Sequence, residues 1–138
     1  MSTEIKFPGY KKNQNSPAIG YSEGIAISSK PVIEIGNDAT FPLYGSFSVS
    51  KKAASEFHPH LLRAVVILLR GPNPVTLNIG TGQILFNDDL INEGEYIRGF
   101  FNLDLFNFFS LAKVPSRYYV NASIFQYVSD VITINVIE

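Results

Sequence analysis

The only two histidines of the chain, His58 and His60, stand two positions apart around a proline. Two imidazoles on alternate positions of an extended segment share one face, and Glu56 could then add a third zinc ligand. The chain has no cysteine, and no second group of nitrogen or sulfur ligands appears elsewhere in the sequence. We therefore expect a polar loop with two solvated histidines and no bound zinc.

Acidic residues are densest between positions 87 and 95, where Asp88 and Asp89 are adjacent. Carboxylates grouped in this way are the hard oxygen ligands that calcium prefers. Their spacing does not match the twelve-residue EF-hand loop, and a solvated turn explains the same composition. We expect no metal here and no cofactor elsewhere.

Catalytic groups are sparse along the chain. Nucleophilic catalysis needs a nucleophile, a base and a group that orients the base, and neither histidine lies near a Gly-x-Ser-x-Gly turn. The segment 80–82, Gly-Thr-Gly, lacks the remaining residues of a phosphate-binding loop and predicts a hairpin turn. A carboxylate pair such as Asp88 with Asp104 stays open. The sequence favours a non-catalytic protein, with a small metal-dependent hydrolase as an alternative.

Composition indicates one folded domain. The chain has 138 residues, of which 46% are hydrophobic and 17% charged, and these proportions suffice for a core. The net charge of −1 supplies no basic field for nucleic acid. The longest apolar run, 64–69, is far too short to span a bilayer, and the first ten residues lack the apolar core of a signal peptide. We expect no membrane span and a cytoplasmic location.

Hydrophobic periodicity predicts an all-β fold. Apolar and polar residues alternate between Phe41 and Ser50, and turn signals recur about every ten residues, as in a sandwich. The segment 1–30 predicts an N-terminal arm with an edge strand, and 31–138 predicts the sandwich domain. Residues 51–60 form a polar link with room for one helical turn. The expected strands are 18–27, 31–35, 41–50, 61–70, 75–79, 83–86, 96–109, 117–124 and 130–137.

The last strands carry a resemblance. Pro115 leads a turn into Tyr118, which heads the alternating apolar set Val120, Ala122 and Ile124. This arrangement resembles the corner of immunoglobulin-like and fibronectin type III sandwiches. The resemblance implies an immunoglobulin-like antiparallel β-sandwich of seven to nine strands. It also implies that the hydroxyl of Tyr118, or of its neighbour Tyr119, hydrogen-bonds back to the turn at 111–114.

The chain has more large apolar residues than simple alternation can bury in one sheet face. In the segment 100–109 alternation leaves phenylalanines on both faces, and 61–70 is apolar on both faces as well. A register-shifting bulge or the N-terminal arm would hide these rings, and so would a second copy of the chain. The sequence therefore predicts a self-association face formed by Phe100, Phe106, Phe108, Val65 and Ile67.

Three functions remain in order of preference. The first is a non-catalytic interaction or structural module whose partner is another copy or another protein. The second is a carbohydrate- or ligand-binding module that stacks its ligand on Tyr10, Tyr21, Tyr44 or Tyr96. The third is the hydrolase around His58 and His60. Aromatic residues that cluster with aliphatic ones favour the first.

Overall fold

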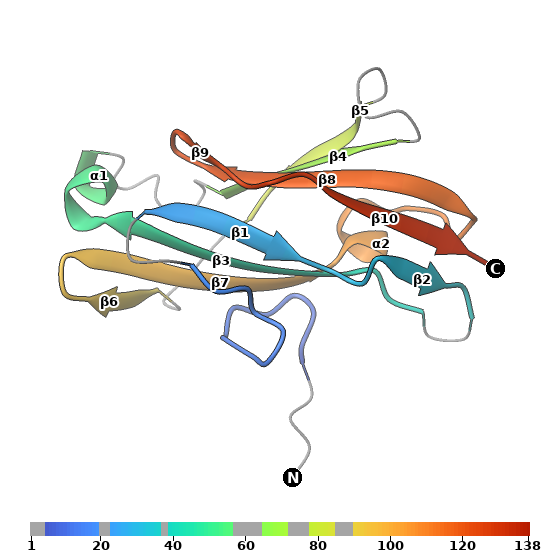
Figure 1. The fold of residues 1–138 in the computed structure, drawn as a ribbon, viewed down its shortest axis with the longest axis horizontal. Helices are drawn as coiled ribbons and strands as arrows, with labels where there is room; N and C mark the ends of the chain where they lie inside the picture. Colours follow the sequence, from blue (N-terminus) through green and yellow to red (C-terminus); the bar gives the residue numbers. More distant parts are fainter. Residues whose placement is uncertain (1–4, 20–22, 37–38, 57–64, 72–77, 85–89) are drawn as a thin grey trace, which may run out of the picture.

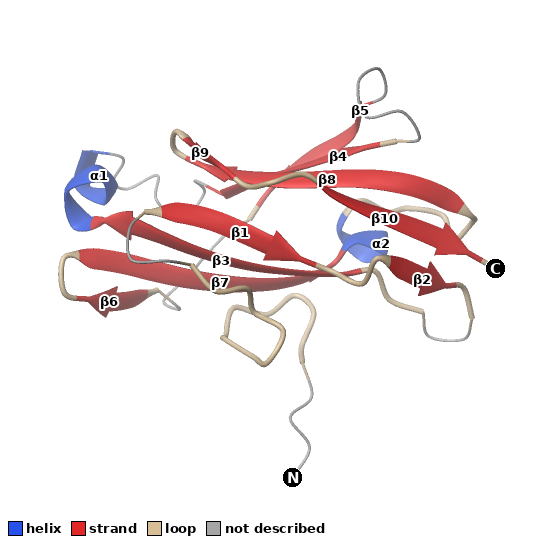
Figure 2. Ribbon diagram, in the orientation of Figure 1, coloured by secondary structure: helices blue, strands red, loops and turns tan. Residues whose placement is uncertain are grey.

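The computed structural model describes residues 5–19, 23–36, 39–56, 65–71, 78–84 and 90–138. Within these ranges two sheets face each other, and two short helices lie at their ends (Figures 1 and 2). The elements are β1 (Gly24–Ser28), β2 (Val32–Glu34), β3 (Pro42–Ser50), α1 (Lys51–Glu56), β4 (Val65–Arg70), β5 (Asn78–Gln83), β6 (Ile91–Glu93), β7 (Tyr96–Asp104), α2 (Leu105–Phe108), β8 (Ser116–Ile124), β9 (Tyr127–Val128) and β10 (Ile132–Ile137).

The predicted all-β sandwich is confirmed. One sheet has the order β1-β3-β7-β6, and the other has β2-β10-β8-β4-β5 with β9 paired to β8. The pairing of β2 with β10 is parallel, whereas the other strand pairs are antiparallel.

The core lies between the sheets. On β8 the alternating set that begins at Tyr118 points inward, and the Tyr118 ring packs 5.5 Å from Phe41. Tyr119 is only half-buried, on the opposite face. Tyr118 is therefore the inward tyrosine of the pair. Packing of its ring against Phe41 anchors this corner in the described part of the chain.

Phenylalanine rings in the core lie over glycines of the neighbouring strand. Gly45 on β3 pairs with Phe101 on β7, and Phe47 on β3 pairs with Gly99 on β7. A Cβ atom built on either glycine would meet the ring of its partner at a distance that real side chains do not show. The missing side chains thus make the room in which these two buried rings sit.

Glycines also make room for phenylalanine rings at residues 80–82, where the predicted hairpin turn was wrong. The segment does not turn: Gly80 and Gly82 lie inside β5, which pairs with β4 along its length. A Cβ on Gly80 would approach Phe109 to 2.8 Å, and one on Gly82 would overlap the ring of Phe108. Glycine is needed here because the rings pack closely against the strand. From the sequence alone, two glycines in this pattern are equally consistent with a turn and with such close packing.

The N-terminal arm, residues 5–19, covers the outer face of the four-stranded sheet (Figure 1). Asn102 holds it in place: its backbone exchanges hydrogen bonds of 2.9 and 2.8 Å with Gly9, and its side chain bonds Lys11 and Asn13. Ser46 and Ser48 are buried beneath it. The alternation in β3 indicates one buried face, but both faces are buried, because the arm covers the polar one.

Candidate functional site

The five residues predicted to form a self-association face do not lie on one surface. Val65 and Ile67 are fully buried and point into the core between the sheets. Phe100 is 9% exposed and lines a cavity under the arm, and Phe106 is 4% exposed within the core cluster. Phe108 is half-buried against β5. In the folded monomer these side chains are already covered by the chain itself.

A change of secondary structure explains why the rings of Phe106 and Phe108 do not follow the predicted alternation. Simple alternation assumed a strand through residue 109, but β7 ends at Asp104 and α2 begins at Leu105. The Oδ1 atom of Asp104 accepts hydrogen bonds from the backbone N–H groups of Phe41, at 3.0 Å, and Phe106, at 3.2 Å. The helical turn then swings Phe106 into the core, where it meets Phe41 edge-on at 5.6 Å.

The residues weighed above as possible metal ligands, His58, His60, Asp88 and Asp89, lie outside the described residues. Among the residues that the structure describes, no three His, Cys, Asp or Glu side chains gather into a group that could hold a metal ion. Asp104, considered above as a catalytic carboxylate, is engaged as a helix cap.

The tyrosines considered as stacking platforms for a sugar are dispersed. Tyr44 is buried under the arm, 6.2 Å from the ring of Phe7, and Tyr21 lies outside the described residues. Tyr10 and Tyr96 are half-buried at separate places. The described tyrosines therefore do not line one groove.

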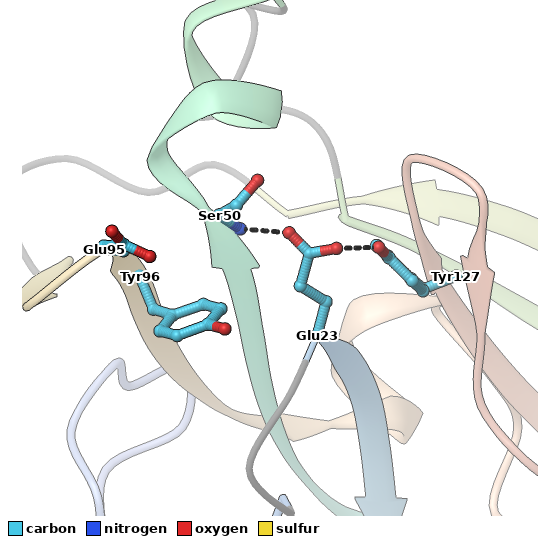
Figure 3. Close-up of a pocket in the computed structure, with 5 residues that line it drawn as sticks. All are labelled: Glu23, Ser50, Glu95, Tyr96 and Tyr127. Atoms are coloured by element: carbon cyan, nitrogen blue, oxygen red, sulfur yellow. Dashed lines mark hydrogen bonds between the residues drawn. The ribbon is translucent and has the colours of Figure 1, made fainter.

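A pocket of about 400 Å³ opens at the end of the sandwich where α1 lies (Figure 3). Glu23, directly before β1, directs its carboxylate between the two sheets. It accepts a hydrogen bond of 2.6 Å from the backbone N–H of Ser50 and another from the hydroxyl of Tyr127 on β9. Glu95 and Tyr96 complete the lining. The Ser50 hydroxyl also accepts from the N–H of Ala53 and so caps α1.

The protonation states of this pair suit a structural link. The hydrogen bond from Tyr127, followed by those from Ser50, lowers the pKa of Glu23 below its usual value. The same bond to Glu23 raises the pKa of Tyr127 above its usual value. At neutral pH the carboxylate stays ionised and the phenol stays protonated, so neither group is poised for general acid or base catalysis. The pair joins β9 of the larger sheet to the start of β1 in the smaller one.

We expect Glu23→Gln to lower the melting temperature at neutral pH. Because the pKa of Glu23 is lower in the folded state, its stabilising effect is present above the unfolded-state pKa of about 4.5. That effect is lost as the pH falls through the folded-state pKa. Thermal unfolding between pH 3 and 7 should therefore show the two proteins converging in acid. Glu95→Gln, from the same pocket, serves as the control, and an equal gap at every pH would contradict the linkage.

Four of the six exposed large aliphatic side chains of the described residues are spaced along the edge formed by β9, β10 and the adjoining β2. Those of Val128 on β9, Val131 before β10, Ile137 at the end of β10 and Val32 on β2 are 63%, 49%, 40% and 48% exposed. Their strand neighbours on the other face, Ile33, Ile134 and Val136, are buried. We call these four exposed residues the aliphatic row. The other two exposed large aliphatics, Ile91 and Val114, lie elsewhere.

Sequence reasoning missed both the Glu23 pocket and the aliphatic row. Glu23 and Tyr127 are 104 positions apart, so no local pattern connects them. The row was accessible to sequence reasoning, since Val131 and Ile137 lie on the face opposite Ile134 and Val136 in a simple alternation. The interface prediction was based instead on the phenylalanines of the segment 100–109.

Comparisons with known proteins do not identify a family. No protein-family model matches the chain, and no curated protein matches its sequence. Among solved structures, it is similar to the crystal structure of AggA, the major subunit of aggregative adherence fimbriae type I from Escherichia coli. The identity is 10%, the match covers 87% of this chain and 98% of that chain, and the TM-score is 0.25. A likeness this weak carries no argument about function.

Neither helix in the described part of the chain is long and apolar enough to cross a membrane.

Proposed function

We propose that the protein is a non-catalytic structural module that associates with further copies of itself through the aliphatic row. The observation that carries the proposal is that four exposed aliphatic side chains are spaced along one edge of the six-stranded sheet. Single apolar residues on a surface need no explanation, but four of the six exposed large aliphatic residues of the described chain lie along this one edge, where a second copy would cover them. This location replaces the aromatic face, whose residues the monomer already covers.

The strand arrangement supports a second copy as the partner. β2 is the end strand of its sheet, and it is only three residues long. An end strand can pair with the equivalent strand of another molecule, and a two-fold contact places the same patch on both sides. Pro31, directly before β2, limits such pairing to a short ladder, so we expect side-chain packing of the row to dominate.

The engagement of Asp104, Glu23 and Tyr127 in structural hydrogen bonds supports a non-catalytic role. Asp104 caps a helix, and Glu23 and Tyr127 bond each other across the sheets. Each of these groups is occupied in holding the fold.

Introducing charge into the row tests the proposal. We expect the double variant Val128→Lys with Ile137→Lys to weaken self-association by at least about tenfold, because both side chains lose apolar contact and like charges face each other in a symmetric contact. Light scattering after size exclusion measures the change. Ile91→Lys is the matched control, since Ile91 is 45% exposed on β6 of the other sheet. If Ile91→Lys dissociates the protein while the double variant does not, the contact lies elsewhere.

A further inference from the structure

A second cavity, of about 240 Å³, lies between the N-terminal arm and the outer face of the four-stranded sheet. The arm supplies one wall, and β3 and β7 supply the other. The hydrogen bonds of Asn102 to Gly9, Lys11 and Asn13 fix the arm beside it, so the cavity is part of the folded architecture. The lining residues on which the inference depends are Lys12, Ile19, Ser46, Ser48, Arg98 and Phe100.

The sheet wall of this cavity carries polar groups that lack partners. Ser46 is 2% exposed and Ser48 is 1% exposed, and neither hydroxyl makes a hydrogen bond. The Nε atom of Arg98, the cross-strand neighbour of Ser48, is also buried without a hydrogen bond. Buried polar atoms in folded proteins are nearly always hydrogen-bonded. Three such atoms beside one cavity indicate that its occupant supplies the missing bonds.

The charges around the cavity select a negatively charged occupant. Arg98 and Lys12 both contribute to the lining, and no Asp or Glu is among the lining residues that the structure describes. Arg98 forms a long ion pair with Glu93 on β6, whose Oε2 lies 3.7 Å from Nε. That distance is longer than a hydrogen bond, and the Glu93 side chain is 63% exposed. Arg98 therefore keeps hydrogen-bonding capacity for an anion.

The remaining wall is apolar. Phe100 on β7 and Ile19 on the arm line it, together with Pro17 and Ala18. An inorganic anion would leave these surfaces without a contact, whereas an organic acid would bury its body against them. We propose that the cavity binds a small carboxylate with an apolar body, whose carboxylate bonds Arg98, Ser46 and Ser48. This site is separate from the aliphatic row and does not depend on self-association.

Titration of the ¹⁵N-labelled protein with three probes tests the assignment. Benzoate combines the carboxylate with an apolar ring, benzamide has the ring without the charge, and inorganic phosphate has the charge without the ring. We expect benzoate to shift the amide signals of Ser46, Ser48 and Phe100 saturably, and the other two probes to bind at least about tenfold more weakly. Absence of saturable shifts at these amides, or equal binding of benzamide or phosphate, overturns the proposal.

Side-chain changes then locate the binding groups. Ser46→Ala combined with Ser48→Ala should weaken benzoate by at least about tenfold while leaving the melting temperature without benzoate unchanged or raised, because the removed hydroxyls have no protein partner. Arg98→Gln should weaken benzoate similarly and provides a second variant if the serine pair impairs folding. Ser123→Ala, on β8 of the other sheet, is the control. Unchanged benzoate affinity in the serine double variant and in Arg98→Gln would overturn the assignment.

Discussion

Replacing Gly45 with alanine is expected to destabilise the sandwich by about 1–3 kcal/mol, the usual cost of overfilling a packed core. The new methyl group would overlap the ring of Phe101, which lies across from Gly45 on β7 and is fully buried. Three ring atoms of Phe101 are within reach of the added carbon, so a small rotation of the ring does not relieve the overlap. Chemical denaturation with urea measures the free energy of unfolding.

A double-mutant comparison separates this overlap from any general effect of alanine in a strand. In a Phe101→Leu background the ring is gone, and Gly45→Ala should then cost much less or stabilise the strand slightly. Gly36→Ala is the control, because a Cβ at that position meets no atom within 4 Å. An equal cost for Gly45→Ala with and without the Phe101 ring would show that glycine does not make room for it.

Replacing Asp104 with alanine is expected to cost about 2–4 kcal/mol. One carboxylate oxygen accepts the N–H of Phe106 at the start of α2 and the N–H of Phe41, whose residue is itself fully buried. Loss of a helix cap costs about 1 kcal/mol, and a buried donor left without a partner adds about 1–3 kcal/mol. We expect α2 to loosen with it, since the cap defines where β7 ends.

The conservative variant Asp104→Asn checks the cause. Asparagine keeps an oxygen that can accept both bonds, so it should retain most of the stability that alanine loses. Urea unfolding and the near-ultraviolet circular dichroism of the phenylalanines are the measurements. If Asp104→Asn is as damaging as Asp104→Ala, the negative charge rather than the hydrogen bonds holds this junction.

Local patterns predicted the strands whose burial follows simple alternation. The set that begins at Tyr118 was read correctly because one face of β8 is buried and the other is half-buried. The alternation in β3 did not predict the burial of its polar face, because the N-terminal arm covers that face. Alternation shows whether a strand face is polar, but it does not show whether that face is covered. Here Asn102 holds the arm over Ser46 and Ser48, and no local pattern predicts this contact.

Glycine and phenylalanine positions were the hardest to interpret from the sequence. Gly80 and Gly82 are compatible with a turn, and only the position of α2 shows that rings of Phe108 and Phe109 occupy the space beside them. The phenylalanines that suggested an exposed face pack against other parts of the same chain. Asp104, which caps α2, is also held by a long-range hydrogen bond that the N–H of Phe41 donates to its carboxylate, and local propensity does not register that bond.

The candidate sites depend even more on distant contacts. Glu23 and Tyr127 meet through the pairing of two sheets, and the cavity with Arg98 exists because the arm folds back. The sequence did supply the side chains of the aliphatic row, in the alternation of β10. It did not show that Val32 belongs to the same edge, because the parallel pairing of β2 with β10 joins residues about 100 positions apart.

The solution mass of the unmodified protein tests the central proposal most directly. Light scattering over a range of concentrations from micromolar to millimolar distinguishes the chain mass of 15.3 kDa from a multiple of it. We predict that the mass rises with concentration to at least twice that value, and that the charged double variant at Val128 and Ile137 prevents the rise. A mass that stays at 15.3 kDa throughout this range would contradict self-association through the aliphatic row.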